Sequence, residues 1–237
     1  MEKGIEYLKK YYNGDLNEAI KRLEDGEPVQ YIVGNVNFYG YELDVNKNVL
    51  IPRRETEELV EEVINRSKDF INPVIIDVGT GSGAIAISLS KELNSHIYAS
   101  DISGEALEVA KKNSNDNNAK ITFYNGDMLK PYIENNIKVD IIVSNPPYIK
   151  ENEEIESIVY NNEPHLALYA KNEGLEFYES ILKDANKVLN DKFLIAFEIG
   201  ETQGEDVKAL ALKYLGNVKF EIKKDLSLKT RMVFVYN

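Results

Sequence analysis

The sequence contains no cysteine and only two histidines, His96 and His165. Without cysteine the chain has neither disulfides nor thiolate metal ligands, and two histidines are too few for the common histidine zinc sites. It also lacks an apolar run of membrane-spanning length, and the residues after Met1 are charged, unlike a signal peptide. We therefore expect a cytoplasmic protein that holds no metal ion.

Basic residues are scarce relative to acidic ones. The chain has 28 Lys and Arg against 40 Asp and Glu, a net charge of −12. Binding of duplex DNA normally requires clustered basic residues, and a pair such as Lys223-Lys224 is too short to form such a surface. A local patch can still bind nucleic acid. The composition nevertheless favours a protein or small-molecule substrate, and we expect no direct nucleic-acid binding.

The amino-terminal part of the chain predicts a short helical segment and then a hairpin. Apolar residues recur at helical spacing over residues 5–23, and a break follows at 25–28. Residues 29–50 are rich in Val, Tyr, Phe and Ile, which favours a β-hairpin or small meander. A further amphipathic helix is predicted over 55–70. We divide the chain into an amino-terminal region, 1–50, and a larger domain, 51–237.

Short apolar runs alternate with helical patterns from residue 73 onward. Strands are predicted at 74–76, 96–100, 121–124, 139–143 and 193–197, with helices ending at 93 and covering 105–115, 173–189 and 205–214. This alternation indicates an α/β fold, with a mostly parallel, Rossmann-like sheet between two layers of helices. Two final runs, 218–222 and 232–236, predict an antiparallel hairpin at one edge.

A glycine-rich turn follows the first of these strands, in the run Asp77-Val78-Gly79-Thr80-Gly81-Ser82-Gly83. Glycines let the backbone turn sharply and let a ligand approach the peptide groups. The spacing is not the Gly-x-Gly-x-x-Gly of nicotinamide enzymes, and a carboxylate at Asp77 would repel a pyrophosphate. A ligand with a cationic amino group and no phosphate fits better, which describes the methionine part of S-adenosylmethionine. The competing interpretation is a tight turn that binds nothing.

Acidic residues follow the next two strands. Asp101 ends the second strand, where an acidic group can bind ribose hydroxyls. Asp127 follows the third strand and is placed to meet an adenine amino group, while Met128 can cover the face of the ring. Each carboxylate taken singly is as readily a solvated loop residue. Together they favour a nucleoside pocket.

The fourth strand ends in Ser144-Asn145-Pro146-Pro147-Tyr148-Ile149. The prolines fix φ and remove two amide donors, so the Asn145 side-chain carbonyl and the Pro146 backbone carbonyl can both accept hydrogen bonds from one planar NH₂ group. Such contacts would turn the nitrogen lone pair towards a methyl donor and oppose the positive charge that develops on nitrogen. Tyr148 supplies an aromatic face. A rigid Pro-Pro turn capped by asparagine is the alternative.

The two motifs together resemble the class I methyltransferases that act on planar exocyclic nitrogens. More of the chain is similar to one branch, the HemK/PrmC family of protein glutamine methyltransferases. The similarity runs from about Arg22 to the end of the chain. It is carried by residues 26–34, 38–40, 49–57, 163–168, 173–175, 198–200 with Gln203, and 225–231.

The resemblance implies transfer of a methyl group from S-adenosylmethionine to the glutamine of the Gly-Gly-Gln motif in peptide chain release factors. The expected cofactor contacts are Asp77, Gly79, Thr80, Gly81, Ser82, Gly83, Asp101, Asp127, Met128 and Asn145. Asn145, Pro146, Pro147 and Tyr148 would hold the glutamine amide, with Asn145, Pro146 and Tyr148 as the catalytic group. Pro52, Arg53 and Thr56 lie in the segment expected to close over the pocket.

Two departures from the family pattern concern the substrate rather than the chemistry. The family usually has a longer helical amino-terminal region for gripping the release factor, so the docking region here is reduced. Arg54 stands where proline is common, which would loosen the loop after Pro52. We expect a monomer, and we interpret His165 as structural or surface-exposed because a glutamine amide needs no strong base before attack.

Three alternatives remain open at this point. The acceptor is a glutamine of a ribosomal protein, or an exocyclic amino group of DNA or RNA, or the chain is a binding module on a degenerate methyltransferase fold. The acidic charge and the absence of an inserted recognition domain count against a nucleic-acid substrate. The intact cofactor and catalytic motifs count against degeneration.

Overall fold

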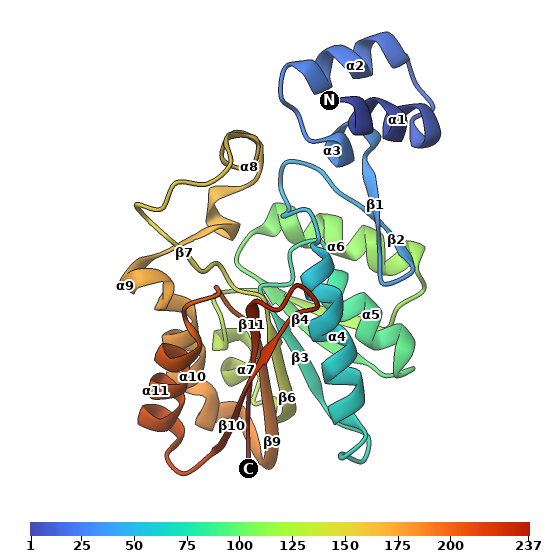
Figure 1. Ribbon diagram of the computed structural model, residues 1–237. Helices are drawn as coiled ribbons and strands as arrows, with labels where there is room; N and C mark the ends of the chain where they lie inside the picture. Colours follow the sequence, from blue (N-terminus) through green and yellow to red (C-terminus); the bar gives the residue numbers. More distant parts are fainter.

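A seven-stranded sheet forms the centre of the computed structural model, which describes residues 1–237 (Figure 1). Its strands are β3 (Ile75–Val78), β4 (Ile97–Asp101), β5 (Ile121–Asn125), β6 (Val139–Ser144), β9 (Leu189–Glu198), β10 (Lys219–Lys224) and β11 (Thr230–Tyr236). They lie in the order β10-β11-β9-β6-β3-β4-β5. The strand β11 is antiparallel to its neighbours β10 and β9, and the five strands from β9 to β5 pair in parallel. The predicted mostly parallel sheet with an antiparallel carboxy-terminal hairpin is confirmed.

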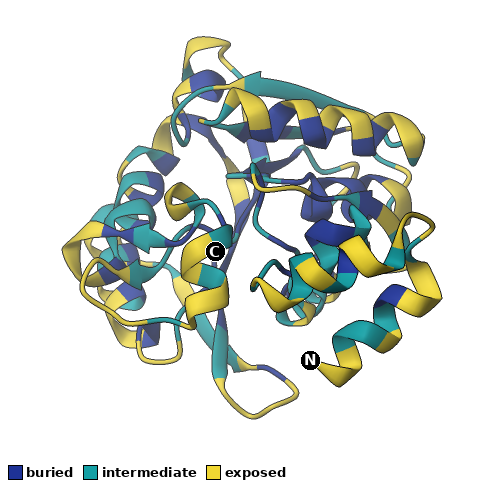
Figure 2. Ribbon diagram, turned by 90° about the horizontal axis from the view of Figure 1, so that it is seen from above, coloured by how far each residue is buried: buried dark blue, intermediate teal, exposed yellow.

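Two layers of helices cover the sheet. One layer holds α4 (Arg54–Ser67), α5 (Ala84–Glu92) and α6 (Gly104–Asp116), and the other holds α7 (Lys130–Glu134), α10 (Glu176–Val188) and α11 (Gly204–Leu215). Side chains alternate along each strand, so Ile75 packs into one apolar core and its neighbour Ile76 into the other. Figure 2 shows the buried strands in the middle and the exposed surfaces of the helices around them.

The first helices form a small cluster apart from the sheet (Figure 1). They are α1 (Glu2–Tyr11), α2 (Leu16–Glu24) and α3 (Val29–Val33), and they pack around Leu8, Ala19 and Ile32. The helical segment predicted over residues 5–23 is therefore present as two helices, α1 and α2. The helical conformation is interrupted before Asp15. The Asp15 carboxylate accepts hydrogen bonds from the amides of Asn17 (2.9 Å) and Glu18 (3.4 Å) and so caps the start of α2.

The predicted hairpin is present but shorter than expected. It consists of β1 (Asn35–Phe38) and β2 (Tyr41–Asp44), whereas the β-branched run ahead of it is the helix α3. Pro28 starts this helix, and Gly34, with φ of 89°, ends it in the left-handed conformation. Phe38 and Leu43 of the hairpin are buried in the core between the sheet and α4. The division of the chain at residue 50 stays a prediction.

A run of short elements connects β6 to α10. It comprises β7 (Ile149–Lys150), α8 (Ser157–Asn162), the 3₁₀ helix η1 (His165–Ala167), β8 (Tyr169–Ala170) and α9 (Lys171–Gly174). The sequence predicts none of these elements. The helix after them, α10, starts at Glu176, three residues later than predicted. None of the helices in the structure has both the length and the apolar character needed to cross a bilayer.

Candidate active site

The site lies where β3 and β6 end side by side. These central strands pair in parallel, with Asp77 opposite Val143, and the chain leaves them in opposite directions across the sheet. Ligands of open α/β sheets bind at this kind of switch point, beyond the carboxyl ends of the strands. The Ser144 hydroxyl donates to the carbonyl of Val78 at 2.6 Å and ties the two strand ends together. The glycine turn after β3 is thus adjacent to Asn145.

One pocket gathers most of the residues that the sequence singles out. Its lining includes twelve of them: Gly79, Thr80, Gly81, Ser82, Asp101, Asp127, Met128, Asn145, Pro147, Pro52, Arg53 and Thr56. Four others, Asp77, Gly83, Pro146 and Tyr148, do not line it. The pocket therefore joins the two sequence motifs with the segment ahead of α4.

The glycine turn presents bare backbone to this pocket. Gly79 and Gly81 have φ of 74° and 56°, and a Cβ added to either would meet no heavy atom within 4 Å. The amides of Gly79 and Thr80 both donate to the carbonyl of Ser100 at 2.9 Å, which holds the turn against β4. At Gly83 the absence of a side chain allows close packing against α6, because a Cβ there would approach the methyl group of Ala110 to 3.3 Å.

Asp77 lies behind the turn, with no exposed surface. Its Oδ2 accepts a hydrogen bond from the Thr80 hydroxyl at 2.6 Å, and its Oδ1 has no partner. The buried hydroxyls of Ser100 and Tyr132 also lack partners. Burial raises the pKa of Asp77 to about 7, against the opposing effect of the hydrogen bond from Thr80. In this position Asp77 shapes the turn, and a direct contact between its carboxylate and a cofactor stays a prediction.

Asp101 connects the turn to the next loop. Its Oδ2 accepts from the amide of Gly81 at 2.8 Å, and its Oδ1 accepts from the amide of Ser103 at 2.9 Å. Burial raises its pKa, while these amide hydrogen bonds lower it. Each carboxylate oxygen keeps a further lone pair for a ligand hydroxyl. The side chain can therefore hold the turn and bind a ribose at the same time.

Asp127 and Met128 form the wall of the pocket after β5. Asp127 is partly exposed and its Oδ2 pairs with Lys130 at 2.6 Å. Met128 has φ of 48°, an uncommon conformation for a residue with a side chain, and such outliers cluster at ligand sites. The positions of both residues are compatible with the predicted adenine contacts.

The Asn-Pro-Pro-Tyr turn is held from several sides. The Asn145 amide nitrogen donates to the Thr56 hydroxyl at 3.1 Å, and the Tyr148 carbonyl accepts from the side-chain amide of Gln203 at 3.1 Å. Pro146 is buried, whereas Pro147 lines the pocket. Burial, together with the nearby charge of Glu198, raises the pKa of Tyr148 to about 12. Tyr148 is therefore neutral near pH 7, and a contact between its ring and the substrate amide stays a prediction.

The segment ahead of α4 is fastened to the loop before η1 by Glu163. The Glu163 carboxylate, whose side chain is only 2% exposed, accepts from the amide of Ile51 at 3.1 Å and pairs with Arg53 at 2.6 Å. Both segments line the pocket, so Glu163 links its two sides. Arg54 is the first residue of α4, a position that suits proline because its amide is unpaired there.

The sequence interpretation misses much of the apolar lining. These residues include Val49, Leu50, Ala84, Ile85, Ile102, Ala106, Leu166, Ala167 and Phe177. Ile102 follows Asp101 directly, and Val49, Leu50, Leu166 and Ala167 lie in segments that resemble the family, but the others carried no signal. Glu163 and Glu198 occur in segments that resemble the family but were not assigned to the site.

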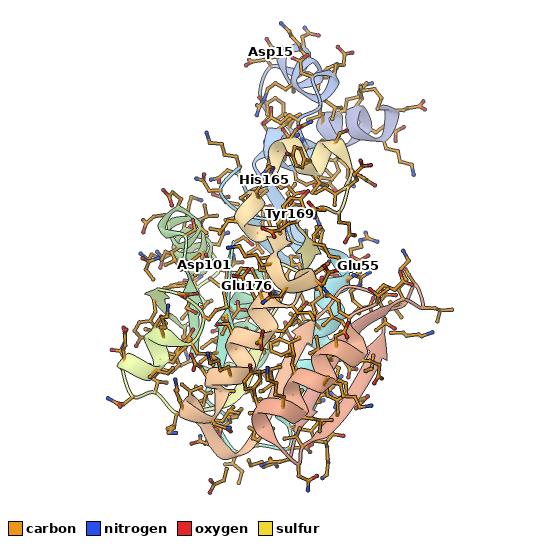
Figure 3. The ribbon with its side chains drawn as sticks, turned by 90° about the vertical axis from the view of Figure 1, so that its left-hand side faces the viewer. Asp15, Glu55, Asp101, His165, Tyr169 and Glu176 are labelled. Atoms are coloured by element: carbon orange, nitrogen blue, oxygen red, sulfur yellow. The ribbon has the colours of Figure 1, made fainter.

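His165 lies outside the pocket lining. Its ring packs against those of Tyr160 and Tyr169, with centroid separations of 4.6 and 5.7 Å, and its Nε2 is 2.7 Å from the Tyr160 carbonyl. In Figure 3 the labelled His165 and Tyr169 lie near one another. These contacts give the histidine a packing role on the surface.

The charges of the pocket favour a cationic cofactor. Its charged lining residues are Arg53, Asp101 and Asp127, and Arg53 is already paired with Glu163. A phosphate-bearing cofactor would need free basic groups or a helix terminus without carboxylates. A sulfonium compound with an amino group meets a bare glycine turn and Asp101, which is in no ion pair, while Asp127 is paired with Lys130. The residues present therefore fit S-adenosylmethionine.

Comparison with known proteins agrees with this site. Residues 55–167 match the family model described as "Methyltransferase small domain". A solved methyltransferase from Pyrococcus furiosus superposes with a TM-score of 0.60 over 83% of this chain and 89% of its own, at 21% sequence identity. This structural likeness shows the class I methyltransferase fold.

Curated relatives are much closer in sequence. "Release factor glutamine methyltransferase" of Bacillus subtilis (strain 168) is 45% identical over 217 residues, which cover 89% of this chain and 75% of the relative. The protein of the same name from Bacillus anthracis is 43% identical over 223 residues, which cover 92% of this chain and 79% of the relative. This chain belongs to the family of release factor glutamine methyltransferases.

Proposed function

We propose that this protein transfers a methyl group from S-adenosylmethionine to the side-chain amide nitrogen of the glutamine in the Gly-Gly-Gln motif of peptide chain release factors. One observation carries the proposal. The cofactor turn after β3 and the Asn145 turn after β6 open into the same pocket, at the ends of strands that pair directly. A methyl donor and a planar amide can therefore meet there.

The cofactor is held by groups that this chain supplies. Gly79 and Gly81 provide the backbone cradle, Asp101 the acceptors for ribose, and Asp127 and Met128 the surroundings of the adenine. When bound, S-adenosylmethionine supplies an electrophilic methyl group.

The glutamine amide is activated by orientation. Its nitrogen lone pair is delocalised into the carbonyl, so nucleophilic attack requires the NH₂ group to be turned and its developing charge to be stabilised. Asn145 Oδ1 and the Pro146 carbonyl accept the two hydrogens and provide both effects. The methylated nitrogen then loses one proton to water. Residues 1–50, with α1, α2 and α3 held apart from the sheet, contribute to docking of the substrate protein.

The test is methyl transfer from tritiated S-adenosylmethionine to purified release factor, to release factor with its Gly-Gly-Gln glutamine replaced by glutamate, to ribosomal proteins, and to DNA and ribosomal RNA. The proposal predicts label in the unmodified release factor and none in the glutamate variant. Label only in ribosomal protein would move the substrate to another glutamine protein. Label only in nucleic acid would refute the proposed function.

A further inference from the structure

A buried chain of side chains leads from the substrate pocket into the core. Asn145 Nδ2 donates to the Thr56 hydroxyl at 3.1 Å, and this hydroxyl donates to Glu198 Oε2 at 2.6 Å. Thr56 and Glu198 are 4% and 2% exposed. The three residues come from the turn after β6, the first turn of α4 and the end of β9. The Thr56–Glu198 bond joins positions 142 residues apart, so no local folding rule requires it.

The order of donors in this chain is determined by Glu198. An ionised carboxylate only accepts hydrogen bonds, and a hydroxyl has a single proton to donate. Because the Thr56 proton is used on Glu198, the Thr56 oxygen can only accept from Asn145. Asn145 must therefore present its NH₂ group to Thr56 and leave Oδ1 for the pocket. An asparagine amide without this constraint could rotate and present a donor to the substrate instead.

We propose that Glu198 is a positioning residue that, acting through Thr56, fixes the Asn145 amide with Oδ1 directed at the substrate glutamine. The proposal rests on the proposed function, in which Oδ1 accepts a hydrogen from the glutamine NH₂ group. If the Asn145 amide were reversed, its NH₂ group would face the NH₂ group of the substrate glutamine, and two donors form no hydrogen bond. The activation of the glutamine amide would then be lost. Thr56 and Glu198 thus select the orientation of Asn145 without themselves touching the substrate amide.

The surroundings of Glu198 make its protonation state responsive to pH. Its neighbours are Thr56 and Glu55 on α4, Asn145 and Tyr148 on the turn after β6, Tyr178 on α10 and Arg231 on β11. Burial raises the pKa of Glu198 to about 7, and Glu55 adds to this, while the Thr56 hydroxyl, Arg231 and the Asn145 amide oppose it. A protonated carboxyl can donate to Thr56, and the fixed order of donors is then lost. The rate of methyl transfer should consequently fall as the pH drops below about 7.

Kinetics of four variants test the relay. Thr56→Val removes the hydroxyl at nearly constant shape, and we expect a loss of methyl transfer on the order of 100-fold with unchanged affinity for S-adenosylhomocysteine. Thr56→Ser keeps a hydroxyl and should retain at least ten times the rate of the valine variant. The glutamine in Glu198→Gln can either accept from or donate to Thr56, so this variant should have a lower rate of methyl transfer. Its rate should also no longer fall at acidic pH, because the glutamine does not titrate. Ser67→Ala, which removes another buried hydroxyl of α4, is the matched control and should leave the rate unchanged.

A readout independent of activity separates this inference from the proposed function. The side-chain ¹⁵N–¹H₂ signals of Asn145, assigned by their loss in Asn145→Ala, should show slow hydrogen exchange in the unmodified protein and in Thr56→Ser, and fast exchange in Thr56→Val. This result supports the relay even if release factor is not the acceptor. Unchanged Asn145 exchange in Thr56→Val, or a Thr56→Val rate equal to that of the unmodified protein, would overturn it. Absence of label in release factor with the expected exchange pattern would refute only the proposed substrate.

Discussion

Substitution of Gly81 by alanine tests whether the glycine turn is a cofactor cradle. Gly81 has φ of 56°, and the added Cβ would meet no protein atom within 4 Å. The protein itself therefore tolerates the methyl group at the cost of backbone strain, about 1 kcal/mol of unfolding free energy. Because Gly81 lines the pocket, the methyl group also enters the space that the cofactor needs. We expect at least a tenfold loss of cofactor affinity, about 1.4 kcal/mol.

Gly34→Ala is the matched control for strain. Gly34 has φ of 89°, its Cβ position is also free of contacts, and it lies at the end of α3 outside the pocket lining. Both variants should lose a similar free energy of unfolding in urea. Titration calorimetry with S-adenosylhomocysteine should then show weaker binding for Gly81→Ala alone. Equal affinity in the two variants would refute the assignment of this turn to the cofactor.

Three further substitutions probe the other parts of the site. Asn145→Ala should lower single-turnover methyl transfer on the order of 100-fold or more while largely sparing S-adenosylhomocysteine affinity, and comparable activity would remove Asn145 from catalysis. Asp101→Ala leaves the amides of Gly81 and Ser103 without their acceptor, so calorimetry should show weaker cofactor binding and urea unfolding a loss of about 1–3 kcal/mol. Burial raises the pKa of Asp77 from 3.8 to about 7, so between these pH values Asp77 is protonated in the folded chain and ionised in the unfolded chain. The free energy of unfolding therefore falls as the pH rises through this range. Asp77→Asn should therefore be more stable than the unmodified protein at pH 8, with the difference shrinking towards pH 5, and a constant difference would contradict the assigned pKa.

The central sheet could be predicted because its strands have a local signature. Residues 75–78 are all buried, and such strands appear in the sequence as short apolar runs between helical patterns. The helix at residues 29–33 has no such signature, because its Val and Ile residues favour strands and the context overrides that preference. The connection between β6 and α10 is made of elements two to six residues long, too short for any periodicity.

The candidate site could be predicted as far as chain connectivity places residues. Strand ends of a parallel sheet meet at one edge, which brings the glycine turn, Asp101, Asp127 and Asn145 together. The supporting contacts could not be predicted in this way. Arg53 and Glu163 pair across 110 residues, and Thr56 meets Glu198 across 142. Such contacts depend on tertiary packing, and each involves a buried carboxylate that looks like an ordinary surface glutamate in the sequence.

We expect the amino-terminal helices to take part in docking rather than in chemistry. The cluster of α1, α2 and α3 has its own apolar centre and stands apart from the sheet, while the hairpin that follows it in the sequence is part of the main core. We expect a substrate protein to be gripped there, at some distance from the pocket, so that the pocket selects a planar amide and the surface around it selects the protein.

A crystal structure of the protein with S-adenosylhomocysteine and a Gly-Gly-Gln peptide would show which atoms hold the substrate amide. We expect the glutamine nitrogen within hydrogen-bonding distance, about 3 Å, of both Asn145 Oδ1 and the Pro146 carbonyl oxygen. A glutamine nitrogen placed elsewhere, with those two oxygens bonded only within the protein, would contradict it.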